Sequence, residues 1–239
     1  MSMRHFGTLF RKDLKDYLQN KNSLLMMLLP LFFALLYSVI FSDGPEAMPP
    51  MYLLSMTVSM SLCLLPTATL SMSIAEEREK NTLRTLVLSG VTAVEFLLSK
   101  ALACLVMLTV VDTLIFAVVG APWGFFPAFL LVTTLAGLCL EFLGGVIGLV
   151  SRDQMSTGTI SAPLMLLLMI PSMLANVNAV LAAIARFSPV YAALQLFGLS
   201  SQNAMFSADA LWYFGVLLVW TLLSLAAFWL VYKKRGTDN

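Results

Sequence analysis

The chain has 239 residues, of which 59% are hydrophobic and 11% charged, whereas a soluble domain carries about 25% charged residues because its surface faces water. The composition therefore excludes an ordinary soluble protein and predicts a membrane protein. The formal net charge is +1, and no basic tract is interleaved with aromatic side chains, so nucleic acid is excluded as a partner.

The amino-terminal segment, residues 1–22, is expected to form an amphipathic helix on the inner membrane surface. Its apolar residues recur at helical spacing, and charged residues fill the other side. The apolar set is Phe6, Leu9, Phe10, Leu14, Tyr17 and Leu18, and the charged set is Arg11, Lys12, Asp13, Lys15 and Asp16. A cationic amphipathic helix binds membrane lipid through both apolar insertion and attraction to anionic head groups. The alternative is that residues 1–22 form a solvated segment before the first span.

Six apolar runs follow, each long enough to cross about 30 Å of hydrocarbon at about 1.5 Å per helical residue. They cover about residues 23–41, 51–74, 96–119, 125–150, 160–184 and 211–232. Residues 186–209 are too long for a turn and carry apolar residues at helical spacing after Pro189, which predicts a short helix at the outer interface. The sequence therefore predicts an all-α polytopic membrane protein that forms a single domain over residues 1–239.

The orientation follows from lysine and arginine. All 14 basic residues except Arg186 fall on one side of the predicted spans. Because basic residues accumulate in cytoplasmic segments, both termini are expected in the cytoplasm, with the loops near residues 43, 122 and 209 outside.

Two carboxylates, Asp112 in the third span and Glu141 in the fourth, lie within apolar stretches. A charge there is costly, so both residues are functional candidates. Their depths differ by on the order of 10 Å, which argues against a shared proton. Each is either hydrogen-bonded to a neighbouring helix in its neutral form, or part of a substrate path or proton relay.

The fourth and fifth spans carry two further patterns. Gly144 and Gly148 form a G-x-x-x-G pair that permits close helix approach, and packing within one chain is favoured over a dimer seam. On the fifth span, Met165, Met169 and Met173 form a polarisable stripe that suits apolar substrates, with ordinary packing as the alternative.

The densest charge lies in the inner loop 75–100, which reads AEEREKNTLRTLVLSGVTAVEFLLSK. Leu83, Leu86, Val87 and Gly90 share one helical side, so a short helix is expected to press them on a neighbouring subunit. The charged residues 76–80 are expected to stay in water. A solvated loop is the alternative by pattern alone.

This loop resembles that of the membrane subunits of ABC-2 type ABC transporters. The matching residues are Glu77, Arg78, Glu79, Thr82, Leu83, Leu86, Ser89, Glu95 and Lys100. Asn81, Gly90 and Ser99 depart from the residues common in the family. The resemblance implies that the loop contains a coupling helix, which docks into a separate cytoplasmic ATPase and passes its closure to the spans.

The resemblance also implies a partner arrangement. The chain would pair with itself or with a paralogous permease in a bacterial or archaeal cell membrane, and two ATPase subunits would bind ATP and Mg²⁺. The expected function is export of an amphipathic or hydrophobic substrate, such as a peptide or drug. An ATP-independent ion-coupled carrier or channel using Asp112 and Glu141, and a membrane anchor for an enzyme, are the alternatives.

The sequence argues against an active site in this chain. None of its 13 glycines is followed by Lys, so the G-x-x-x-x-G-K-[ST] phosphate loop of an ATPase is missing. His5 is the single histidine and cannot build a metal site or a catalytic relay. Cys63, Cys104 and Cys139 are expected to be packing residues. No catalytic residue, metal or cofactor is therefore expected in this chain.

The charge asymmetry makes the topology testable. In a background without the three native cysteines, single cysteines at residues 1, 85, 155 and 239 should be shielded from an impermeant thiol reagent in intact cells. Cysteines at residues 46, 122 and 205 should be labelled. External labelling at residue 85 would contradict the proposed orientation.

Overall fold

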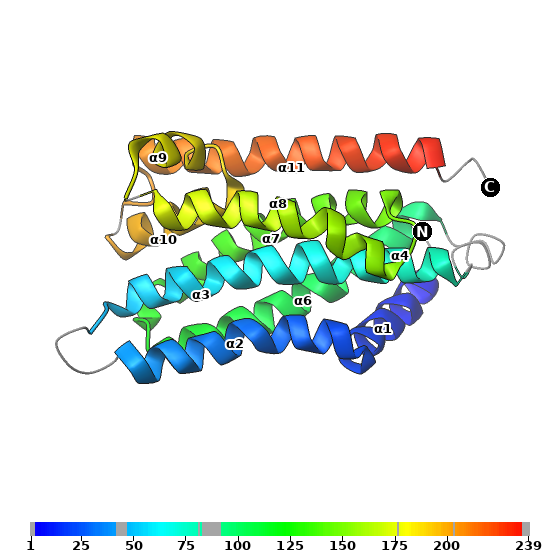
Figure 1. Cartoon of the computed structure of the whole chain (residues 1–239), viewed down its shortest axis with the longest axis horizontal. Coiled ribbons are helices and arrows are strands. Elements are labelled where there is room, and N and C mark those ends of the chain that lie inside the picture. The colour runs from blue at the N-terminus through cyan, green and yellow to red at the C-terminus, as the bar shows by residue number, and fades with distance from the viewer. Residues whose placement is uncertain are drawn as a thin grey trace.

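The computed structural model describes residues 3–41, 47–80, 82, 92–175, 177–202 and 204–235, in which every regular element is helical. The long helices lie side by side in one bundle (Figure 1). They are α1 (Met3–Gln19), α2 (Lys21–Phe41), α3 (Pro50–Leu64), the π-helical turn η1 (Leu65–Thr69), α4 (Leu70–Glu79), α6 (Ala93–Val119), the 3₁₀ turn η2 (Trp123–Phe125), α7 (Phe126–Val150), α8 (Gln154–Leu174), α9 (Ala179–Ala185), α10 (Pro189–Ser201) and α11 (Ala208–Arg235).

Six segments of the described residues are long and apolar enough to cross a membrane. These are α2, the continuous α3–η1–α4, α6, η2 with α7, α8, and α11. The prediction of an all-α polytopic membrane protein is therefore confirmed. In Figure 1, α1 and the carboxyl end of α11 lie at one end of the bundle, which we call the α1 end, and α9 and α10 lie at the other, the α10 end.

The second span is the centre of the bundle. In α3–η1–α4, 78% of the most apolar window is buried, compared with 17% in α2 and 22% in α11. The π-helical turn in this span contains Pro66, which has no backbone N–H to donate to the helix. α2, α8 and α11 are peripheral and present apolar side chains outward.

The glycine pair of α7 packs directly on this central span. A Cβ atom at Gly144 would lie 2.5 Å from the Pro66 carbonyl oxygen and 2.8 Å from that of Thr67. One at Gly148 would lie 2.8 Å from the Ser71 carbonyl oxygen. The two glycines thus let α7 approach the backbone of η1 and α4, and their predicted role in packing within one chain is confirmed.

The fifth span differs from its predicted range. α8 begins at Gln154 rather than near residue 160, where Asp153 and Ser156 form a capping box. It ends at Leu174 rather than near residue 184, and α9 follows as a separate helix. The Asn178 side chain caps α9 by accepting hydrogen bonds from the N–H groups of Val180 and Leu181 at 2.8 and 3.4 Å.

The predicted helix after Pro189 exists as α10, but it packs into the bundle. It turns by 95° relative to α9 and contacts α3, α7 and α11. Val190, Leu196 and Phe197 are fully buried in these contacts. α10 therefore contributes to the core at its end of the bundle.

The amino-terminal segment forms α1, as its pattern predicts, but the placement of Asp13 on its exposed charged side was wrong. Asp13 shares the helix side of Leu9 and Tyr17, and this side is buried where α1 packs on α6. Arg11 and Lys15 are exposed. The position of α1 on a membrane surface stays a prediction.

The close approach of α7 to η1 can be tested with two glycine substitutions. Gly144→Ala should destabilise the protein by about 1–3 kcal/mol, because the new methyl group meets backbone atoms that cannot rotate away. Gly215→Ala in α11 is the matched control, since nothing lies within 4 Å of its Cβ position. SDS-induced unfolding in mixed micelles measures both, and equal stability of the two variants would show that α7 is not held against η1.

Candidate functional site

The candidate site is organised around Lys100, which is 1% exposed near the start of α6. Thr92 and Glu95 form a capping box that begins this helix. The Lys100 Nζ atom lies 3.0 Å from Asp13 Oδ1 on α1 and 3.0 Å from Glu77 Oε1 on α4. A buried ammonium group is tolerated only when opposite charges and hydrogen bonds replace its water. Lys100 therefore binds both helices together.

Lys12 balances the charge of this arrangement. Its Nζ atom lies 2.6 Å from Glu77 Oε1 and 3.7 Å from Asp13 Oδ1. Lys12, Asp13, Glu77 and Lys100, which we call the charge cluster, contain two positive and two negative groups and are neutral overall. Asp16 also lies 3.4 Å from Lys12, but it is exposed to solvent and is not counted in the cluster. Burial lowers the pKa of Lys12, but the hydrogen bond and charge of Glu77 outweigh it, so the pKa of Lys12 is raised and the ion pair persists at neutral pH.

Hydrogen bonds with neutral hydroxyl groups complete the cluster. The Ser99 hydroxyl donates to Asp13 Oδ2 at 2.7 Å, and Lys100 Nζ donates to Ser73 Oγ at 2.8 Å. The Tyr17 hydroxyl donates to the Lys100 carbonyl at 3.4 Å, and burial raises the pKa of this hydroxyl well above its usual value. α1, α4 and α6 therefore cannot separate without leaving a buried charge unpaired.

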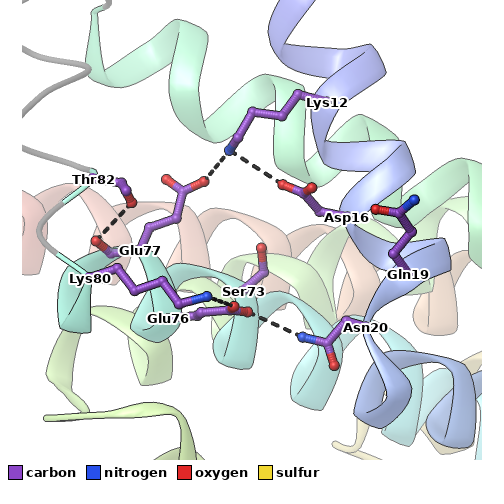
Figure 2. A pocket seen from close by; sticks show the side chains of 9 residues that line it. All are labelled: Lys12, Asp16, Gln19, Asn20, Ser73, Glu76, Glu77, Lys80 and Thr82. Atoms are coloured by element: carbon purple, nitrogen blue, oxygen red, sulfur yellow. Dashed lines mark hydrogen bonds and ion pairs between the residues drawn. The ribbon is translucent and has the colours of Figure 1, made fainter.

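A pocket of 380 Å³ opens beside the charge cluster, between α1 and α4 (Figure 2). Its lining residues are Lys12, Asp16, Gln19, Asn20, Ser73, Glu76, Glu77, Lys80 and Thr82. Glu76 accepts hydrogen bonds from Lys80 at 2.5 Å and from Asn20 at 3.1 Å. The Thr82 hydroxyl donates to the Glu77 carbonyl at 3.1 Å, so the chain just beyond α4 is attached to a residue of the cluster.

The charged residues at the end of α4 contact the chain itself. Glu77 is 7% exposed, so the expectation that it stays in water was wrong. Arg78 donates to the carbonyl oxygens of Leu149 and Ser151 at the carboxyl end of α7, where a cation is favourable. Glu79 Oε2 accepts from the backbone N–H of Gln154 at 3.1 Å, where α8 begins.

The rest of the predicted coupling segment lies outside the residues that the structure describes. Leu83, Leu86 and Ser89 lie outside the described residues, and Thr82 is the one member of residues 81–91 that is placed. The contact with a second subunit that the sequence predicts for this segment stays a prediction.

The intramembrane candidates do not form one site. Asp112 on α6 is fully buried and accepts a hydrogen bond from Ser61 on α3. Glu141 on α7 is also fully buried, and its carboxyl group lies beside the Cys104 thiol of α6 without an N–H or O–H partner within the described residues. The hydrogen-bonded role and the role on a substrate path or proton relay both stay predictions for these two residues.

The methionine stripe lies elsewhere. Met165, Met169 and Met173 are half-buried along α8. Met173 lines a 130 Å³ pocket between α3, α8 and α10, which also contains Tyr52, Ser172 and Gln195. Neither intramembrane carboxylate lines this pocket.

Sequence reasoning missed the contribution of α1 to the site. Lys12, Asp13 and Tyr17 are far from the charged loop in sequence, and their partners on α4 and α6 come from contacts over more than 55 residues. One signal was available, since Leu9, Asp13 and Tyr17 are spaced four residues apart and so share one helix side.

A family model described as ABC-2 family transporter protein matches residues 50–230. The matched range begins with α3 and ends within α11, so it contains Glu77 and Lys100 but not α1. No curated protein matches the chain.

The neutrality of the charge cluster makes a double substitution informative. Lys100→Met should lower the free energy of unfolding by about 3–5 kcal/mol, because two buried carboxylates then share Lys12 alone. Asp13→Asn combined with Lys100→Met leaves the balanced pair of Lys12 and Glu77, so this double variant should recover part of the loss. Lys15→Met on the exposed side of α1 is the control. A double variant less stable than Lys100→Met, in the same SDS unfolding assay, would exclude charge neutrality as the stabilising principle.

Proposed function

Because the chain belongs to the ABC-2 transporter family, we propose that it is the membrane subunit of an ATP-driven exporter. A separate cytoplasmic ATPase binds ATP and Mg²⁺ and supplies the energy, since the sequence has no phosphate loop. In this proposal both termini and residues 81–91 face the cytoplasm of a bacterial or archaeal cell, in agreement with the distribution of basic residues.

The observation that carries this proposal is the position of the charge cluster relative to residues 81–91. One end of this segment, Thr82, is hydrogen-bonded to Glu77. Thr92, the residue that follows this segment, caps α6, the helix that carries Lys100. Glu77 and Lys100 are themselves an ion pair of 3.0 Å. A force applied to residues 81–91 by a docked ATPase therefore acts on α4, α6 and α1 together.

Coupling of this kind needs a difference in contact between two states of the ATPase. The charge cluster supports such a transfer because Lys100 links α6 to α1 and α4 through two short, buried ion pairs. Arg78 and Glu79 extend the same connection to α7 and α8. Closure of the ATPase would in this way move all the spans that contact α4.

The proposed substrate is amphipathic or hydrophobic, for example a peptide or a drug. α2, α8 and α11 present apolar side chains on the outside of the bundle, which suits contact with lipid and with a second permease. The stripe of Met165, Met169 and Met173 and the adjoining pocket of 130 Å³ offer an adaptable surface with hydroxyl and amide groups at its rim. We propose that two permeases, identical or paralogous, form the pathway between them.

The coupling proposal predicts the effect of changing two leucines. Leu83→Ser with Leu86→Ser should leave the chain inserted, because insertion is governed by the spans. It should abolish substrate-stimulated ATP hydrolysis and export in vesicles reconstituted with the ATPase, because apolar contacts of a docked helix outweigh exposed charges. Arg84→Ser with Thr85→Ser, in the same loop, should retain most of both activities.

The critical observation is the double leucine variant with the ATPase still bound. If it exports substrate at the wild-type rate, residues 82–89 are not the coupling element. If the ATPase partner cannot be reconstituted with the wild-type chain at all, the exporter proposal itself fails.

A further inference from the structure

Glu141 is the starting point, because no charged group and no N–H or O–H donor compensates its burial within the described residues. The side chain is 0% exposed, neither carboxyl oxygen has an N–H or O–H partner within the described residues, and the neighbouring Cys104 thiol is only a weak donor. An ionised carboxylate in this position would lose its hydration without replacement, at a cost of several kcal/mol. Glu141 therefore holds a proton in this conformation. Asp112, by contrast, receives a hydrogen bond from Ser61.

A line of buried polar groups runs from Glu141 towards the α1 end of the bundle. The Cys104 thiol on α6 lies beside the Glu141 carboxyl. Lys100 is one helical turn nearer the α1 end on the same side of α6, and its carbonyl accepts from the Tyr17 hydroxyl at 3.4 Å. Tyr17 also lies beside Ser73, whose hydroxyl is 2.8 Å from Lys100 Nζ.

We call Ser73, Tyr17, Lys100, Cys104 and Glu141 the polar column. Its outer end is open, because Ser73 lines the 380 Å³ pocket beside the charge cluster and its hydroxyl lies among the other labelled side chains in Figure 2. Its inner members Tyr17, Cys104 and Glu141 have at most 1% exposure. The column thus joins an open pocket to a fully buried carboxyl group.

Other titratable groups also lie on the elements that pack against α7. In the described residues, η1 and α8 contain no titratable side chain, and α11 faces this level of α7 with Thr221 and Ser224 beside Cys139. The remaining titratable or charged groups on the elements that pack against α7 are Tyr52 and Cys63 on α3, Glu76, Glu77, Arg78 and Glu79 on α4, Glu95, Lys100, Cys104 and Asp112 on α6, Tyr191 on α10, and Asp209, Tyr213, Tyr232, Lys233, Lys234 and Arg235 on α11.

We propose that Glu141 is a proton-binding site that exchanges its proton with the α1 end of the bundle through the polar column. On release, the Glu141 O–H bond breaks and the proton passes to water that enters beside Cys104 and Tyr17, leaving by the pocket at Ser73. Uptake is the reverse, so water is the only co-reactant. This site is additional to the proposed export function, since it concerns a second ligand and residues of this chain alone.

The charge cluster controls entry to the column. Lys100 belongs to both, and a shift of α1 away from α6 would separate Asp13 from Lys100 and expose the Tyr17 hydroxyl. Water could then reach Glu141 and accept its proton. Protonation of Glu141 is thereby linked to the same movement of α1, α4 and α6 that residues 81–91 are positioned to drive.

The first test measures the charge state of Glu141 by infrared spectroscopy of the purified full-length chain in lipid bilayers. The carbonyl stretching band of a protonated carboxyl group should be present in the wild type and lost in Glu141→Gln. Asp209→Asn, which changes an exposed carboxylate at the start of α11, is the control and should leave that band in place. If Glu141→Gln loses no such band, Glu141 is ionised and the proposal is wrong.

The second test measures access to Glu141 after transfer into D₂O, which shifts the same band as deuterium replaces the proton. The wild-type band should shift, and Tyr17→Phe, which removes one hydroxyl and keeps the ring, should slow the shift about tenfold. Tyr37→Phe on α2, outside the column, should exchange at the wild-type rate. A wild-type band that never shifts, or an unchanged rate in Tyr17→Phe, would overturn the column as the proton route. Neither measurement uses the ATPase, so these outcomes are separate from those of the export proposal.

Discussion

A charge inside a medium of low polarity must be neutralised where it lies, and this requirement determines how the α1 end of the bundle is assembled. Lys100 satisfies it only by drawing Asp13 from α1 and Glu77 from α4, while Lys12 restores the balance. Three helices from distant parts of the sequence are consequently fixed by one set of ion pairs. Residues 81–91 connect α4 to α6 along the chain, so two of the three helices held by the cluster flank the proposed coupling segment.

The spans could be predicted from sequence because the length of an apolar run and the placement of basic residues are local properties. The fifth span shows the limit of this reasoning. Residues 175–184 remain apolar enough to extend the run, and the break is produced by Asn178, whose side chain begins α9. Likewise, α10 has the apolar periodicity of an interfacial helix, but the 95° turn from α9 directs it into the bundle.

The candidate site was only half predictable. Glu77, Arg78 and Glu79 stood out because they are dense charge beside an apolar span, yet each proved to have a partner within the chain. These partners are far away in sequence, and no local pattern specifies them. Asp13 was assigned to water because of its residue type, although its spacing from Leu9 and Tyr17 places it on the buried side. Residue chemistry and helical position gave opposite answers, and position was right.

The π-helical turn η1 constrains the number of residues between the centre of the second span and Glu77. A π turn accommodates one residue more than an α-helical turn, so it offsets the sides of α3 and α4 by about 100°. Gly144 of α7 rests on the carbonyl groups of this turn, and Glu77 lies two further turns along α4. Losing or gaining one residue between 65 and 77 would therefore rotate Glu77 away from Lys100 while leaving hydropathy almost unchanged. Related chains should tolerate exchanges of residue type in this stretch more readily than insertions or deletions.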